Sequence, residues 1–216
     1  YLQRICGNTF YYMTERDIQD IEDLTIYETG KNLDFASIEE TDKTIRDIAE
    51  KLNIAVGKGV CYTIDTSSQP HYVFQYEILV NGMPLAMFDG GSYSGDAYVP
   101  GTYMTAVVDA DGIRHYDVSY VLEELESGES KKVLTLDEAL QAVDDKYNSV
   151  IMEGEYFIDD IQMAYTPVQT EETGIVRLIP VWYFQTTHQI LVPNRSGTGK
   201  VMLPQSGYIL INALDG

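Results

Sequence analysis

Few residues in this sequence have the types and spacing that catalysis requires. Gly90–Gly95 reads GGSYSG and resembles the turn around a nucleophilic serine, but neither Ser92 nor Ser94 has glycines two positions before and after it. Glycine and serine in this proportion are typical of loops. The segment therefore predicts a flexible loop, and we identify no catalytic residue in the chain.

Metal ligands are equally hard to assemble from the sequence. The three histidines, His71, His115 and His188, lack the spacing of a ligand pair on one helix. Asp109–Gly112 resembles the start of a calcium loop, but Tyr120 stands where the twelfth-position glutamate would be needed. We therefore predict no metal site, no cofactor and no enzymatic activity.

The two cysteines, Cys6 and Cys61, are too few for a disulfide framework. One bridge between them and two free thiols both remain open. No catalytic motif lies beside either residue, so a reactive thiol is not predicted.

A tyrosine-rich segment is the best candidate for a binding surface. Gly91–Gly101 and the residues that follow carry Tyr93, Tyr98 and Tyr103 among glycines and serines. Recognition loops favour this composition because tyrosine offers a large contact area at low entropic cost. A long hairpin without a binding role is the alternative, and the sequence does not choose between them.

Two helices are expected, each beginning with a capping box. Ser37–Glu40 and Thr135–Glu138 place a hydroxyl three residues before a glutamate, so each pair can satisfy two backbone amides. Apolar residues recur behind each box at helical spacing. Each helix thus presents one apolar face to a sheet.

Strands follow each helix in a similar order, which indicates an internal repeat. Tyr72–Tyr76 matches Ile179–Tyr183 at an offset of 107 residues, and Val107–Gly112 matches Ile211–Gly216 at an offset of 104. In the first copy, Asp111-Gly112 predicts a type I′ hairpin turn. Pro180 has no amide, so we expect it at an edge or on an unpaired side of its strand.

These patterns predict an α+β protein of two tandem modules, each one helix packed on an antiparallel sheet. The predicted divisions are an N-terminal extension (1–36), a first module (37–125), a linker (126–132) and a second module (133–216). Within the extension, Thr9–Met13 could add a strand to the first sheet. The second module either continues past Gly216 with one more strand or leaves an open edge.

The charge of the chain limits its partners. Fourteen Lys and Arg against 34 Asp and Glu give a net charge of −20, and the densest basic run is Lys131-Lys132 in the linker. Such a chain repels nucleic-acid phosphates and anionic membrane surfaces. No apolar run reaches the length that crosses a bilayer, so this portion should not insert into a membrane.

The strand Tyr72–Tyr76 running into Asn81–Pro84, and the strand Ile179–Tyr183 with its closing Ile211–Gly216 turn, resemble PepSY-like modules. Tandem versions are similar to the extracellular part of YycH/YycI-type regulators and related exported lipoproteins of Gram-positive bacteria. This resemblance implies a cystatin-like helix-on-sheet fold in each module. It also implies an exported protein, held at the cell surface by a tether upstream of Tyr1.

The same resemblance implies a function without chemistry, in which the protein binds and regulates another envelope protein. A sheet edge or the tyrosine-rich loop would make the contact. Two alternatives remain open, an inhibitor of an extracellular peptidase and a binder of cell-wall sugar or peptide. The second would use exposed tyrosines and Trp182, although the apolar strand around Trp182 favours a place in the core.

Overall fold

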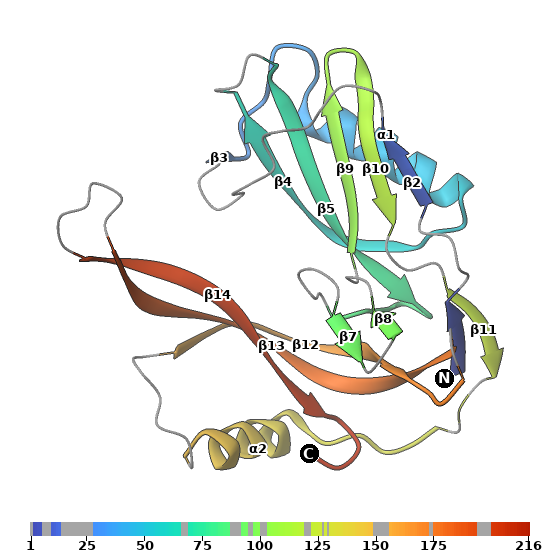
Figure 1. The fold of residues 1–216 in the computed structure, drawn as a ribbon, viewed down its shortest axis with the longest axis vertical. Helices are drawn as coiled ribbons and strands as arrows, with labels where there is room; N and C mark the ends of the chain where they lie inside the picture. The colour runs from blue at the N-terminus through green and yellow to red at the C-terminus, as the bar shows by residue number, and fades with distance from the viewer. Residues whose placement is uncertain are drawn as a thin grey trace. The chain divides into compact units, whose positions relative to one another are not determined.

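The computed structural model of this protein describes residues 2–5, 10–13, 28–65, 69–86, 92–94, 97–99, 103–118, 122–126, 128, 130–148, 156–172, 175–193 and 200–216. They form two helices, two antiparallel sheets and a separate two-stranded hairpin, which confirms the predicted α+β class (Figure 1). No helix among these residues has the length and apolar character to cross a membrane.

The chain divides into two compact units. Unit 1 contains Tyr1–Ser127 together with Pro167–Arg177, and unit 2 contains Gly128–Thr166 and Leu178–Gly216. The division near residue 127 falls inside the segment 126–132 that the composition marks as a linker. The segment Pro167–Arg177 belongs to the first unit, and no local sequence feature predicts this.

Unit 1 is built on a seven-stranded sheet in the order β2-β10-β9-β5-β4-β3, with β6 on β5. The strands are β2 (Phe10–Met13), β3 (Glu28–Thr29), β4 (Val56–Ile64), β5 (His71–Val80), β6 (Met83–Pro84), β9 (Tyr103–Asp109) and β10 (Gly112–Val118). The prediction that Thr9–Met13 adds a strand to this sheet is confirmed, because β2 pairs with β10. The sequence around Ile18–Leu24 is compatible with a short helix or an irregular acidic segment, and it lies outside the described residues.

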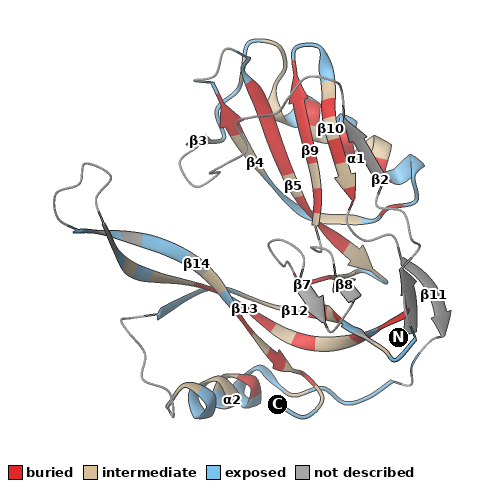
Figure 2. Cartoon of the chain, in the orientation of Figure 1, coloured by how far each residue is buried: buried red, intermediate tan, exposed pale blue. Residues whose placement is uncertain are grey.

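Helix α1 (Ile38–Lys51) covers one face of this sheet, and its predicted start is confirmed. The Ser37 hydroxyl accepts a hydrogen bond from the amide of Glu40, while the Glu40 carboxylate accepts one from the amide of Ser37. The aromatic side chains of β5 on the helix face, Tyr72, Phe74 and Tyr76, are fully buried. Figure 2 shows most of β5 in the colour of buried residues. This aromatic row and the apolar stripe of α1 make the core of the unit.

Unit 2 contains α2 (Leu136–Asn148) and most of three strands, β12 (Tyr156–Gln169), β13 (Ile175–Pro193) and β14 (Lys200–Asn212). The second capping box is also confirmed, since the Thr135 hydroxyl and the Glu138 amide are 3.3 Å apart. Ala139 of α2 packs with Phe184, Ile209 and Ile211 of the sheet. Unit 2 therefore repeats the helix-on-sheet arrangement of unit 1 with fewer described strands.

Two strands from unit 1 join the sheet to which β13 belongs. Strand β1 (Leu2–Ile5) pairs with β11 (Leu122–Glu126) on one side and with Ile175–Arg177 of β13 on the other. From Val181 to Pro193, β13 pairs with β14. Pro180 lies between the residues of β13 that pair with β1 and those that pair with β14. This place suits proline, which has no backbone amide to donate a hydrogen bond. The sequence did not predict β1, because four residues carry too weak a pattern.

Pro180 also explains how the start of α2 is tied to the sheet. Its carbonyl accepts a hydrogen bond from the amide of Ala213, 2.9 Å away. An ordinary pair would return a second bond, but proline has no amide to donate. The Ala213 carbonyl instead accepts from the amide of Leu134, 2.7 Å away, so the residue before the helix N-cap completes the ladder.

The predicted type I′ turn at Asp111-Gly112 is wrong. Gly112 pairs with Asp109, so the two linking residues are Ala110 and Asp111. Among the described non-glycine residues only Asn53 and Asn81 have positive φ, whereas a type I′ turn needs positive φ at both linking residues. The Asp111 amide instead donates to the Asp109 carboxylate, 2.9 Å away. That side-chain bond stabilises the turn with Gly112 in the left-handed region.

Candidate functional site

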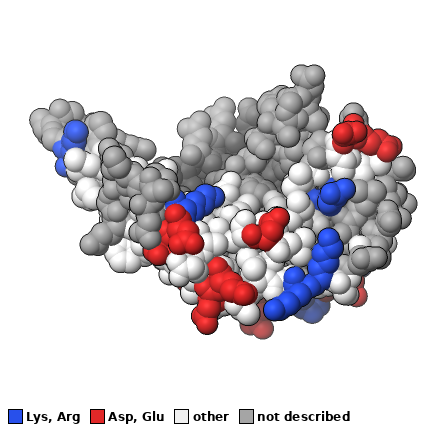
Figure 3. All heavy atoms as spheres, turned by 90° about the horizontal axis from the view of Figure 1, so that it is seen from below, with Lys and Arg blue, Asp and Glu red and all other residues white. Residues whose placement is uncertain are grey.

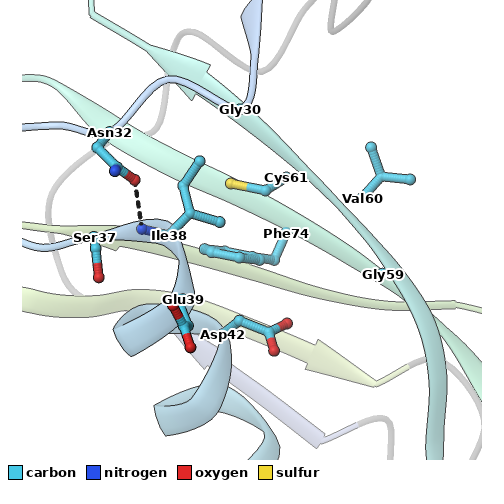
Figure 4. Close-up of a pocket in the computed structure, with 10 residues that line it drawn as sticks. All are labelled: Gly30, Asn32, Ser37, Ile38, Glu39, Asp42, Gly59, Val60, Cys61 and Phe74. Carbon is cyan, nitrogen blue, oxygen red and sulfur yellow. Dashed lines mark hydrogen bonds between the residues drawn. The ribbon is translucent and has the colours of Figure 1, made fainter.

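A groove lies in unit 1 between the first turn of α1 and strand β4 (Figure 4). Its volume is about 490 Å³, which matches sites for small molecules or single peptide side chains. Ten residues line it: Gly30, Asn32, Ser37, Ile38, Glu39, Asp42, Gly59, Val60, Cys61 and Phe74. The lining has two carboxylates, an apolar floor and no Lys, Arg or His.

The groove exists because β4 carries small residues on its helix-facing side. Gly59 is paired with Tyr76 and Cys61 with Phe74, so both face α1 together with the aromatic row. A Cβ atom at Gly59 would lie 2.6 Å from the Tyr76 ring, which leaves no room for a larger residue. Glycine inside a strand often marks a close approach of this kind.

Among the described residues, strand β3 pairs with only one end of the outer edge of β4. β4 pairs with β5 along its length, but its other neighbour, β3, reaches only Thr63 and Tyr62. Lys58, Gly59 and Val60 are exposed, Val60 by 47%.

Three of the first four amides on the helix side of the groove are already satisfied. Asn32 accepts from the amide of Ile38 at 2.9 Å, and the Ser37 hydroxyl and carbonyl accept from the amides of Glu40 and Thr41. A helix N-terminus binds an anion through such amides. With them occupied and with Glu39 and Asp42 beside them, the groove suits a cation rather than an anion.

Asp42 is held in place by two partners. The hydroxyl of Tyr76 donates to one of its oxygens at 2.8 Å, and Arg46 Nε donates to the other at 2.8 Å. Arg46 also lies 4.9 Å from the centre of the Tyr76 ring and donates to the carbonyl of Gly57. Burial, and then the bond to Asp42, raise the pKa of the Tyr76 hydroxyl. Tyr76 therefore stays protonated and acts as a donor.

Cys61 is the one sulfur nucleophile that the structure describes at this groove. Burial, and secondarily the charge of Asp42, raise the pKa of its thiol from 9.0 to about 12. The thiolate is the reactive form, so this thiol is a poor nucleophile near neutral pH. Cys61 is a free cysteine, and the disulfide with Cys6 that the sequence left open is not formed. Cys6 itself lies outside the described residues.

The tyrosine-rich segment forms a short hairpin in the part that the structure describes. β7 (Ser92–Ser94) pairs with β8 (Ala97–Val99), and Tyr93 and Tyr98 are Cα partners. Tyr103 begins β9 opposite Glu77. Tyr93 and Tyr98 thus lie in a short hairpin and Tyr103 in β9, and the role of all three in binding stays a prediction.

The histidines and the aspartates of the calcium-like turn have separate places in the fold. His71 bonds the carbonyl of Gln69 through Nδ1, and His188 stacks on Tyr156 with ring centres 4.5 Å apart. Asp109 forms a buried ion pair with Arg114, at 2.5 Å. In the described part of the chain no three His, Cys, Asp or Glu side chains gather at one point that could hold a metal.

A second exposed surface lies in unit 2 and was not found from the sequence. Six of the eleven exposed large apolar side chains among the described residues belong to its strands: Tyr156, Phe157, Ile158, Leu191, Met202 and Tyr208. Leu191 and Met202 are paired across β13 and β14 and are 56% and 54% exposed. We call the pair Leu191–Met202 the hairpin surface.

The hairpin surface faces away from α2. Pairing in register places Leu191, Met202 and Tyr208 on the face opposite to Phe184 and Ile209, which contact the helix. Leu191 lies seven residues beyond Phe184, or about 23 Å along the strand. The signal that could have revealed this surface is charge, because no Asp or Glu occurs between Glu172 and Asp215 in a chain of net charge −20.

Charge elsewhere is mixed rather than concentrated. The face in Figure 3 carries described acidic and basic side chains as separate, interspersed spots. No broad basic patch is visible among the described residues on that face. The charge pattern thus gives no support to a nucleic-acid surface there.

No known family profile and no curated protein sequence matches this chain. A solved structure, an uncharacterized protein from Eubacterium rectale, is similar with a TM-score of 0.72 at 21% identity. The match covers 88% of this chain and 57% of that protein, so the chain spans little more than half of its structural neighbour. At this identity the similarity shows the fold alone.

Proposed function

We propose that this protein is a non-catalytic module that binds and regulates another protein, in the extracytoplasmic setting that the resemblance to tandem PepSY-like regulators implies. The observation that carries the proposal is the hairpin surface of unit 2. Exposed apolar side chains that gather on one part of a fold commonly mark a protein-binding site. The partner's contact surface should be apolar at its centre and neutral or acidic around it.

The charge of the strands around the hairpin surface is the reason why we expect a neutral or acidic partner surface. The strands β13 and β14 contain Arg177 and Lys200 and no acid, whereas the rest of the chain carries all 34 acidic residues. Close to the hairpin surface, an acidic partner would therefore meet no like charge on these two strands. Local charge of this kind influences which partner is selected.

Two features of unit 1 agree with a binding role. The thiol of Cys61 is held in its unreactive form, and the carboxylate of Asp42 is occupied by Tyr76 and Arg46. Neither group is arranged as a nucleophile or a general base. Trp182 packs, partly buried, against the core cluster of unit 2, so the sugar- or peptide-binding alternative would rely on exposed tyrosines.

Cross-linking capture from an envelope extract of the source cells tests this proposal. The bait is the wild-type chain, the double variant Leu191→Ser/Met202→Ser, or the control Val133→Ser, which changes an exposed apolar residue off the hairpin. We expect one dominant protein that the double variant loses and the control retains. Capture that is equal for all three baits would rule out the hairpin surface as the contact, and capture of a peptidase would favour the inhibitor alternative.

A further inference from the structure

We infer that a second copy of this chain covers the hairpin surface of unit 2, so that the protein forms a symmetric dimer when no other partner is bound. The inference rests on the proposed function, because it names an occupant for the same surface. In a twofold dimer the same patch of both copies makes the contact, so that patch must be complementary to itself.

The residues around the hairpin surface form one exposed face of the sheet. Leu191 and Met202 are 56% and 54% exposed. The next pair on the same face, Gln189 and Pro204, is exposed as well. Lys200, two residues before Met202, continues this face toward the tip of the hairpin and is also exposed. An apolar centre thus lies on a continuous, exposed surface.

Two opposite charges lie at the ends of this face. Lys200 marks the end near the tip. Asp159 of β12 marks the other end, because its carboxylate accepts a hydrogen bond from the Thr187 hydroxyl at 2.6 Å and Thr187 lies on the same face as Leu191. Lys200 is paired with Pro193, six residues beyond Thr187, so the two charges are about 20 Å apart along the strands.

This order of charges makes the face complementary to itself. When a second copy is turned end for end and laid on the face, Lys200 of each copy lies opposite Asp159 of the other. The midpoint between the charges falls next to the pair Leu191–Met202, so the apolar pairs of the two copies lie about 7 Å from each other along the strands. A parallel placement would instead set like charges against each other.

The charge of the whole chain favours this place for self-association. Two copies of net charge −20 repel each other wherever their acidic residues meet. The sequence between Glu172 and Asp215, which includes β13 and β14, contains no acid. A contact through these two strands therefore brings together the parts of the copies that repel each other least.

The size of the face sets the expected strength of the dimer. It is about 20 Å long and three strands, or about 14 Å, wide. This is small beside the standard of about 800 Å² per partner, and small interfaces are weak and transient. We therefore expect a dissociation constant of about 100 µM, which lets the second copy exchange with a different partner.

Sedimentation equilibrium of the full chain, at about 10 to 500 µM around that constant, tests the inference. We expect the average mass to rise with concentration from that of one chain, 24.3 kDa, toward twice that value. Leu191→Ser/Met202→Ser should stay monomeric, and the control Val133→Ser should dimerise like the wild type. A single-chain mass at every concentration would overturn the dimer without touching the proposed function, because no other protein is present in this measurement.

Charge reversal tests the antiparallel placement. Lys200→Glu and Asp159→Lys should each weaken the dimer at least about tenfold, because each variant sets like charges together at both ends of the contact. An equimolar mixture of the two variants should associate as the wild type does, since every contact again joins opposite charges. Lys43→Glu on α1 changes the net charge equally and should leave the dimer intact. A mixture that stays monomeric, or dimers of the Leu191→Ser/Met202→Ser variant, would overturn the inference.

Discussion

The indole Nε1 of Trp182 donates a hydrogen bond to the carbonyl oxygen of Leu134, 2.9 Å away, and joins β13 to the segment that leads into α2. The amide of the same Leu134 donates to Ala213 at the end of β14. Both backbone groups of one residue thus bind two neighbouring strands. The position of α2 on its sheet depends on this residue as well as on apolar packing.

Trp182→Phe removes this bond while keeping an aromatic ring in the core. We expect a loss of about 1–2 kcal/mol in the free energy of unfolding, because the partly buried carbonyl of Leu134 loses its donor. Chemical denaturation followed by circular dichroism measures it. Tyr147→Phe, at the other end of the same core cluster, is the control. A Trp182→Phe value within 0.3 kcal/mol of wild type, taken as roughly the precision of such measurements, would contradict the role of the bond.

The contributions of Asp109 and Arg114 to the free energy of unfolding should be strongly non-additive, because the two side chains form a buried ion pair. Both side chains are about 6% exposed, and Arg114 also bonds Gln69. Removing either partner alone leaves a buried charge, which costs about 3–5 kcal/mol. We expect Asp109→Ala and Arg114→Ala to be severely destabilised and the double variant to be less so than their sum. Additive losses in the double-mutant cycle would show that the two charges do not interact.

The capping box of α1 gives a prediction on pH. The hydroxyl and amide of Ser37 hold the pKa of Glu40 below its ordinary value of 4.5. A depressed pKa in the folded state stabilises the fold above the ordinary value, and this contribution is lost as the pH falls through the folded pKa. NMR titration should show that Ser37→Ala raises the pKa of Glu40 toward 4.5. An unchanged Glu40 pKa in this variant would mean that the capping box does not set it.

Alkylation tests the state of Cys61 directly. A thiol pKa of about 12 instead of 9.0 lowers the thiolate fraction near neutral pH about 1,000-fold. In a Cys6→Ser background, iodoacetamide should therefore modify native protein far more slowly than denatured protein. Asp42→Asn should raise the native rate, because it removes the nearby charge. Native and denatured rates within tenfold of each other would show an accessible, ordinary thiol.

Short-range patterns in the sequence determined the local elements. Both capping boxes form as predicted, because the hydroxyl and the glutamate of each are three residues apart and need no distant partner. The strand identity of Tyr72–Val80 and the place of the hairpin near Asp109 follow from side-chain type and turn residues in the same way. Asn81-Gly82, with positive φ at both residues, is where the type I′ geometry occurs.

The comparison of the two repeats shows what the sequence could not decide. At the offset of 107, Phe74 corresponds to Val181, yet Phe74 faces α1 while Val181 lies on the opposite face from Trp182, which packs toward α2. The offset of 104 likewise matches Val107 with Ile211, which lie on opposite faces relative to their helices. Side chains alternate along a strand, so a shift of one residue exchanges the two faces.

The tertiary structure alone decided the contacts between distant segments. The pairing of β1 with β13, the link from Leu134 to Ala213 and Trp182, and the groove between α1 and β4 each join residues far apart in the chain. Single strands and small residues leave no periodic signal of their partners. The sequence by itself therefore determined the helices, most strands and the α+β class, while register, facing and the candidate binding surfaces depended on long-range packing.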